Sequence, residues 1–172
     1  MLHDKYLSQY HFAERHALII NSSPEKIFPC ISAFDFGQSS VVRLLLRLRG
    51  MRQASAGGLE GFTRMGFILL ELKSNEELIM GLIGQFWKPD GNIQHCASPE
   101  QFIMHDNPHH AKTTWNFKLT PYPEGKTLAE TETRIYCGKE ALHGFKRYWF
   151  FIRPFSGLIR KEMLKGIKRK AE

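Results

Sequence analysis

The chain has 172 residues, 42% of them hydrophobic and 24% charged, which suits one folded domain and excludes a largely disordered chain. No apolar run is long enough to cross a bilayer, the polar start Met1–Lys5 is unlike a secretory signal, and three scattered cysteines argue against a disulfide framework, so we expect a cytoplasmic protein. The net charge of +7 comes entirely from residues 138–172, which contain ten Lys or Arg and three Glu.

The first third of the chain predicts one strand followed by two short helices. Alternating and β-branched residues predict a strand over Ser8–Asn21. Ser23–Glu25 then supplies an N-cap serine, a proline for the first helical position and an acid for the first turn, and Pro29 should limit or bend the short helix that follows. Helical spacing predicts a second helix over Gln38–Arg49. The apolar stripes of these two helices are Ile27, Phe28 and Ile31, and Val41, Leu44, Leu45 and Leu48.

Two apolar runs in the middle of the chain predict strands that meet at a turn. The runs are Phe67–Leu72 and Glu77–Trp87, and the Ser-Asn pair between them is a turn signal. Gly81 and Gly84 indicate a bulge or a close approach of another segment in the second run. That run is apolar on both strand faces. We therefore expect both faces to be covered, and the sequence leaves open whether the cover is an internal segment or the partner chain of a homodimer.

The strand pattern continues to the start of the C-terminal helix. Short strands are expected at Ile93–Cys96 and Gln101–His105, and longer ones at Ala111–Thr120 and Thr127–Tyr136, where apolar and polar residues alternate. Strands grouped in this way predict an α+β fold with a mainly antiparallel sheet.

From Lys139 onward the spacing of apolar residues becomes helical. The predicted helix stripe consists of Leu142, Phe145, Trp149, Ile152, Ile159, Met163 and Ile167. Pro154 lies inside this pattern and lacks a backbone donor, so it should kink or split the helix.

The order of these elements resembles the START-like superfamily, also called SRPBCC, a group that includes polyketide cyclases and lipid-transfer domains. The residues that carry the resemblance are Ala111–Phe117, Thr131–Ile135, Tyr148–Trp149 and Ile152–Arg160. The resemblance implies one helix-grip domain over residues 1–172. In that fold a curved antiparallel sheet wraps round a long C-terminal helix, and two short helices follow the first strand.

Such a fold implies an elongated apolar cavity between the sheet and the C-terminal helix, with a filled core as the alternative. The leading hypothesis is the binding of a small hydrophobic or amphipathic molecule of the lipid, quinone or polyketide class, without a cofactor. The alternative is an enzyme of the cyclase or dehydratase type that uses acid–base groups in the same cavity. The predicted lining residues are Trp115, Phe117, Thr131, Thr133, Phe145, Trp149 and Ile152.

Two groups of polar residues could carry chemistry. Glu130, Glu132 and Arg134 share one strand face, which is either an acid–base row inside the cavity or a solvated face with one ion pair. His105–His110 contains three histidines and an aspartate around an Asn-Pro turn. Its spacing fits no metal template, so we expect a polar exposed loop and no metal site. His95 and Cys96 are strand neighbours that point to opposite faces, which argues against a nucleophile–base pair.

Basic residues form two further groups. The cations of the C-terminal helix either form a solvated face or make peripheral contact with an anionic membrane or an acidic protein. No nucleic-acid reader motif is present, so specific nucleic-acid recognition is not expected. The second group consists of Arg43, Arg47, Arg49 and Arg52, which would lie either at the cavity mouth or on an exposed helix face.

Overall fold

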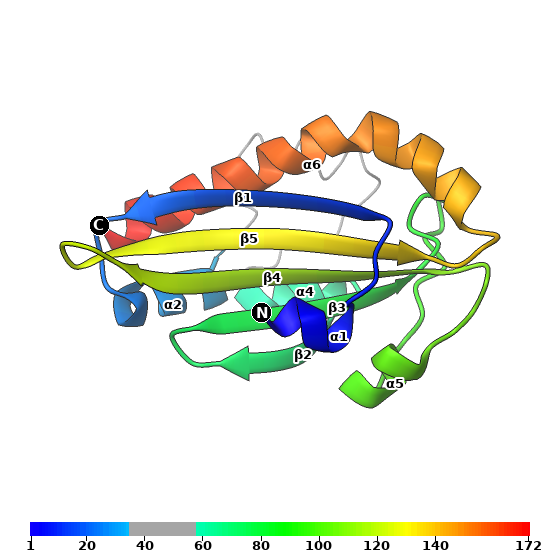
Figure 1. The fold of residues 1–172 in the computed structure, drawn as a ribbon, viewed down its shortest axis with the longest axis horizontal. Helices are drawn as coiled ribbons and strands as arrows, with labels where there is room; N and C mark the ends of the chain where they lie inside the picture. Colours follow the sequence, from blue (N-terminus) through cyan, green and yellow to red (C-terminus); the bar gives the residue numbers. More distant parts are fainter. Residues whose placement is uncertain (35–57) are drawn as a thin grey trace.

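A computed structural model describes residues 1–34 and 58–172 of the chain. Five antiparallel strands form one sheet in the order β1-β5-β4-β3-β2, and the long helix α6 lies along it (Figure 1). The predicted α+β, helix-grip fold class is confirmed. The elements are α1 (Leu2–Tyr6), β1 (Phe12–Ile20), α2 (Pro24–Ser32), α4 (Gly58–Arg64), β2 (Ile68–Lys73), β3 (Glu77–Gly84), α5 (Pro99–Met104), β4 (Ala111–Tyr122), β5 (Lys126–Cys137) and α6 (Leu142–Ala171).

The longer predicted strands and the first predicted helix agree with this order, and three short helices, α1, α4 and α5, were not predicted. The helix predicted at Gln38–Arg49, with the arginine group that includes Arg52, lies outside the described residues. Gly58 begins α4, which follows the residues that the structure does not describe. Pro29 lies inside α2 and does not end it. The helix continues for three residues, to Ser32.

The pairing of the strands places the first strand of the chain beside the last. β1 pairs with β5 from Phe12↔Ile135 to Ile20↔Thr127, and β5 pairs in turn with β4. In this register Trp115 lies opposite Thr133. Because side chains of directly opposed residues point to the same face, these two residues share a face of the sheet.

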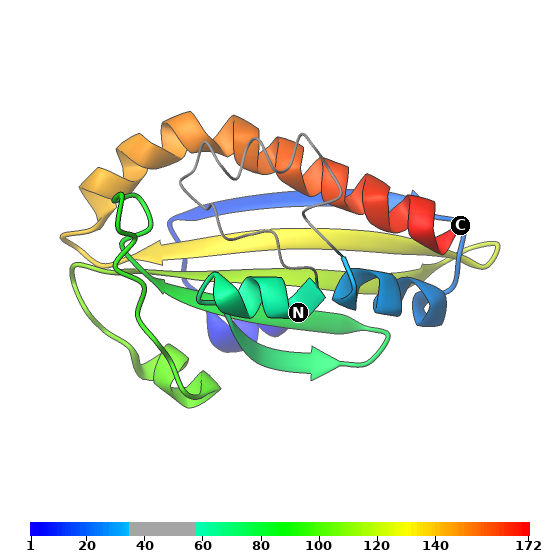
Figure 2. The same ribbon diagram turned by 180° about the vertical axis from the view of Figure 1, so that it is seen from behind.

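Each face of the sheet has its own cover. One face packs against α2, α4 and α6, and the other carries α1 (Figures 1 and 2). All eight residues of β3 are buried. Leu78 and Met80 belong to the core on the α6 side, whereas Ile79 and Ile83 pack with residues of α1 and α5 on the other. The cover expected on both faces of β3 is therefore internal to the chain.

The segment between β3 and β4 corrects two strand predictions. Gln101–His105 does not form a strand, because Ser98, Pro99 and Glu100, the same residue types as Ser23–Glu25, start a helix, α5. The Ser98 hydroxyl accepts a hydrogen bond from the backbone N–H of Gln101 at 3.3 Å. Ile93–Cys96 makes only an isolated bridge, between Gln94 and Ile83.

The glycines of β3 mark close approaches, as predicted. A Cβ atom on Gly81 would lie 2.7 Å from the ring of Phe102, so the missing side chain lets α5 pack directly on the sheet. A Cβ atom on Gly84 would lie 2.9 Å from the carbonyl oxygen of Asn92. The bulge itself is in the neighbouring strand β2, between Leu69 and Glu71.

The helix α6 is continuous from Leu142 to Ala171, although Pro154 lies inside it. Its axis bends over the sheet and is not split (Figure 1). Phe145, Ile159, Met163 and Ile167 of the predicted stripe are buried. Phe145 holds the first half of α6 against β1, β4 and β5, where the candidate site lies, and the other three hold the second half against the main core.

Candidate functional site

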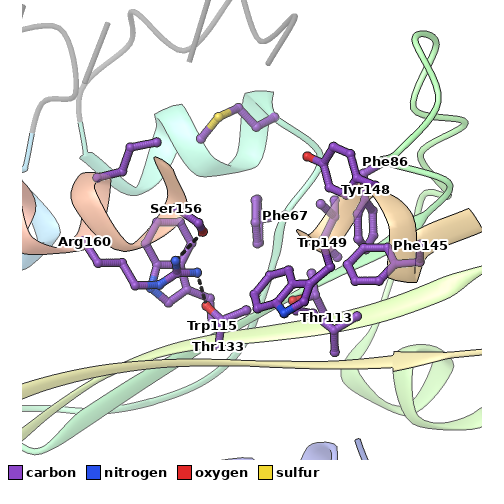
Figure 3. A pocket seen from close by; sticks show the side chains of 14 residues that line it. Phe67, Phe86, Thr113, Trp115, Thr133, Phe145, Tyr148, Trp149, Ser156 and Arg160 are labelled. Atoms are coloured by element: carbon purple, nitrogen blue, oxygen red, sulfur yellow. Dashed lines mark hydrogen bonds between the residues drawn. The ribbon is translucent and has the colours of Figure 1, made fainter. Parts of the chain in front are cut away.

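A cavity of about 80 Å³ lies between the sheet and the first half of α6 (Figure 3). Strands supply one wall and α6 supplies the other, while residues near α4 and the end of β3 close the side. Most of the side chains around it are apolar or aromatic. The lining residues are Met65, Phe67, Leu82, Phe86, Thr113, Trp115, Thr133, Ile135, Phe145, Tyr148, Trp149, Ser156, Ile159 and Arg160.

Four of the predicted lining residues do line this cavity: Trp115, Thr133, Phe145 and Trp149. Strand alternation turns Trp115 and Thr133 toward α6, and helical spacing turns Phe145 and Trp149 toward the sheet. Whether they contact a ligand stays a prediction.

The other three predicted lining residues do not line it. Phe117 lies two residues farther along β4 and packs in the core beneath α2 and the second half of α6. Thr131 is fully buried, and its hydroxyl donates to the carbonyl of Asn116 at 2.8 Å and accepts from the indole Nε1 of Trp115 at 2.7 Å. Ile152 is half-buried on α6, outside the set of residues that form the cavity wall.

Among the described residues of the cavity wall, Arg160 is the charged one. It lies one helical turn after Ser156, and its guanidinium donates to the hydroxyl oxygens of Ser156 and Thr133 at 2.5 Å each (Figure 3). The same group lies 5.1 Å from the ring centroid of Trp115, a cation–π distance. Glu14 of β1 brings a carboxylate oxygen within 3.6 Å of it. A buried cation, hydrogen-bonded to two hydroxyls and close to a carboxylate, thus lies beside an aromatic ring.

Aromatic rings build the opposite end of the cavity around Phe145. Phe86, Trp87 and Tyr148 each place a ring centroid 5.7 Å from that of Phe145, and Trp149 stacks on it at 6.0 Å. Edge-to-face and stacked rings at these distances stabilise each other beyond simple burial. Phe86, Tyr148, Ser156 and Arg160 were among the lining residues that were not predicted. Helical spacing from Phe145 and Trp149 offered a signal for the last three.

The row of Glu130, Glu132 and Arg134 faces away from this cavity, and it is not solvated either. All three side chains are buried on the α1 side of the sheet. The guanidinium of Arg134 pairs with Glu132 at 2.7 Å and with Asp4 of α1 at 2.7 Å, and Glu130 pairs with Arg15. Both interpretations of this row are corrected, because α1, which was not predicted, covers a polar face.

His3 docks α1 onto that polar face. Its side chain is fully buried, and its Nδ1 lies 2.8 Å from the hydroxyl of Thr114. The Glu77 carboxylate accepts the backbone N–H of Leu2 and the side-chain amide of Asn116, which fixes the start of α1. Burial lowers the pKa of His3, because the surroundings desolvate the charged imidazolium.

We expect acid to loosen α1 through His3. Since the folded-state pKa lies below 6.5, the unfolded chain binds more protons as the pH falls through that value, and stability decreases. His3→Asn should make the fall in the free energy of unfolding between neutral and mildly acidic pH shallower, and should cost about 1 kcal/mol at neutral pH through the lost hydrogen bond. Urea unfolding at several pH values measures both quantities. His143→Asn, at an exposed position of α6, is the control. A slope unchanged by His3→Asn contradicts this role of His3.

Two of the three histidines of the His105–His110 segment pair with each other. The rings of His105 and His110 stack with their centroids 5.2 Å apart, and their nitrogens lie 3.0 Å apart. Burial lowers the pKa of both imidazoles. His110 is buried, which corrects the expectation of a fully exposed loop. Among residues 1–34 and 58–172, no group of three His, Cys, Asp or Glu side chains has the geometry of a metal site.

Comparisons with known proteins give a few distant structural likenesses. No protein-family model matches the chain, and no curated protein sequence matches it. Protein MLL2253 from Mesorhizobium loti is 15% identical with a TM-score of 0.45, over 92% of this chain and 96% of that one. TTHA0849 from Thermus thermophilus is 7% identical with a TM-score of 0.37, over 93% and 97%. CalU16 from Micromonospora echinospora is 11% identical with a TM-score of 0.33, over 94% of each chain. At these values the likeness carries no conclusion about function.

Proposed function

We propose that the chain binds a small amphipathic molecule in the cavity between the sheet and α6. The ligand's polar or anionic end lies at Arg160, and its apolar body lies against Trp115, Phe145 and Trp149. The observation that carries this proposal is the buried guanidinium of Arg160 on the wall of a largely aromatic cavity. A planar cation with several donors suits a carboxylate or a ring of carbonyl oxygens. Fatty acids, quinones and polyketides have such oxygens on an apolar body.

The size of the cavity sets a condition on this proposal. Its volume is about 80 Å³, whereas sites for ligands of this class commonly enclose roughly 300–1,000 Å³. The cavity therefore has to widen when the ligand enters. Tyr148 and Trp149 are half-buried members of the wall on α6, and outward rotation of their side chains widens the space without breaking a strand.

We also propose that the chain belongs to the START-like superfamily and that the protein is cytoplasmic. Membership of the START-like superfamily is supported by the order of the elements together with the residues quoted for the resemblance. A cytoplasmic location is supported by the free cysteines Cys30, Cys96 and Cys137.

The cyclase or dehydratase alternative has weaker support. Within the described part of the chain, the titratable side chains on the cavity wall are Tyr148 and Arg160. Glu130, Glu132 and His3 lie on the other side of the sheet. General acid–base catalysis needs a donor and an acceptor within reach of the reacting atoms, so the wall favours binding over this chemistry.

Titration with decanoate and decanol, at concentrations below aggregation and without vesicles, tests the proposed function. The two probes share an apolar chain and differ in the group that meets Arg160. We expect both to change the tryptophan fluorescence, and decanoate to bind about tenfold more tightly, as one additional charge-assisted hydrogen bond would give.

Three variants locate the binding in the cavity. Trp149→Ala should weaken both probes, and Arg160→Lys should reduce the preference for decanoate because a point charge replaces the planar fork. Phe151→Ala, on the outer side of the same helix, is the matched control and should leave both affinities unchanged. Absence of any fluorescence change or thermal stabilisation with either probe would reject ligand binding at this site.

A further inference from the structure

The outward face of the first half of α6 is strongly apolar. Phe150 and Phe151 are 78% and 71% exposed, and Phe155 and Leu158 are 44% and 42% exposed. These residues belong to the same helical turns as Phe145, Trp149 and Ser156, which point inward and line the cavity. Large apolar side chains gathered on an outer helix face mark a contact surface, since isolated ones are common but clusters are not.

Positive charge is interleaved with these rings. Arg147, Arg153 and Lys161 are exposed, and the segment from Leu142 to Lys161 contains no acidic residue. Among the residues that the structure describes, none pairs with any of these three cations. The surface therefore offers unneutralised positive charge beside exposed phenyl rings.

A shallow groove runs along the same surface. Its lining combines Phe12, Phe150, Phe151 and Pro154 with the cations Lys146 and Arg153. Arg147, Phe150, Pro154, Leu158 and Lys161 follow one another at spacings of three and four, so they lie on one side of the helix. This side is opposite to the buried stripe that faces the sheet.

We propose that this aromatic-basic face, formed by Arg147, Phe150, Phe151, Phe155, Leu158 and Lys161, docks on the surface of an anionic phospholipid bilayer. Rings of this kind enter the boundary between headgroups and acyl chains, while Lys and Arg pair with anionic headgroups. No described helix is long and apolar enough to span a bilayer, and the docked helix lies in the plane of the surface. The lack of acids on this face fits negative headgroups better than a neutral surface. The docking does not require the proposed cavity ligand.

Vesicle flotation of the whole protein tests the docking. Vesicles of phosphatidylcholine with phosphatidylglycerol should carry the protein, and vesicles of phosphatidylcholine alone should carry much less. Raising NaCl from about 0.1 M to about 1 M shortens the Debye length from roughly 10 Å to roughly 3 Å and should release most of the bound protein.

Two pairs of variants separate the apolar and the electrostatic parts. Phe150→Ser with Phe151→Ser should weaken binding about tenfold or more, because interfacial affinity scales with buried apolar area. Met104→Ser removes a side chain that is 81% exposed on α5 and should change nothing. Arg147→Glu with Lys161→Glu should weaken binding about tenfold or more. Lys73→Glu with Lys88→Glu, which alters the net charge equally at exposed sites elsewhere, should have a smaller effect.

Three results would overturn the proposal. The first is absence of binding to the anionic vesicles. The second is undiminished binding by both double variants of this face, Phe150→Ser with Phe151→Ser and Arg147→Glu with Lys161→Glu. The third is a dimer in light scattering that Phe150→Ser with Phe151→Ser converts to monomer, because this face would then belong to a second copy of the chain. Decanoate binding by variants that no longer float would separate docking from the cavity.

Discussion

Arg160→Met is expected to lower the free energy of unfolding by about 3–5 kcal/mol, the range for removing one partner of a buried ion pair. The variant leaves the carboxylate of Glu14 buried next to an apolar side chain, and the hydroxyls of Ser156 and Thr133 lose their donor. Among the described residues, Glu14 keeps its contact with His16, at 2.9 Å. Urea unfolding followed by circular dichroism gives the change.

Two further variants show whether the pairing with Glu14 is the cause. Arg153→Met removes an exposed arginine of the same helix and should stay within about 0.5 kcal/mol of wild type. Adding Glu14→Gln to Arg160→Met removes the unpaired charge and should recover part of the loss. A double variant no more stable than Arg160→Met alone would show that Glu14 is not the partner that matters.

Phe145→Ala is expected to cost about 3–5 kcal/mol, since truncating a buried phenylalanine removes both transfer energy and packing contacts. Phe145 is almost fully buried at the centre of the aromatic cluster, and five of its neighbours are themselves rings. The truncation also enlarges the cavity of about 80 Å³, so the variant should take up benzene and gain thermal stability from it.

Phe150→Ala is the matched control for this prediction. It truncates a phenylalanine five positions later on the same helix, where the ring is exposed, and should alter stability by no more than about 0.5 kcal/mol. Equal destabilisation by the two variants would mean that the aromatic cluster does not hold the first half of α6 on the sheet.

The periodic elements could be predicted from the sequence, and the short ones could not. β4, β5 and α6 are long enough for alternation or helical spacing to accumulate. α1 has only five residues, and its position depends on buried contacts of His3 and Leu2 with strands more than 70 residues away. α5 carried a readable start signal in Ser98–Glu100, but the apolar residues after it favoured a strand.

The candidate site shows the same limit at the level of side chains. Alternation correctly assigned Trp115 and Thr133 to the face beneath α6. It could not say where along that face the packing stays open, so it included Phe117 and Thr131, which lie in filled core. Arg160 was missed because a single arginine in a basic helix gives no sign of burial. Its side chain points inward because it contacts Thr133 of β5, Ser156 of α6 and Glu14 of β1.

The adjacency of β1 and β5 has a consequence for how the chain is made on the ribosome. β1 is translated well before the strand that flanks it and before the α6 helix that packs over it. At about 5–20 residues per second, β1 waits roughly 5–20 s for residues 126–137. During that interval the nascent polypeptide keeps an unpaired edge of β1 open to chaperones.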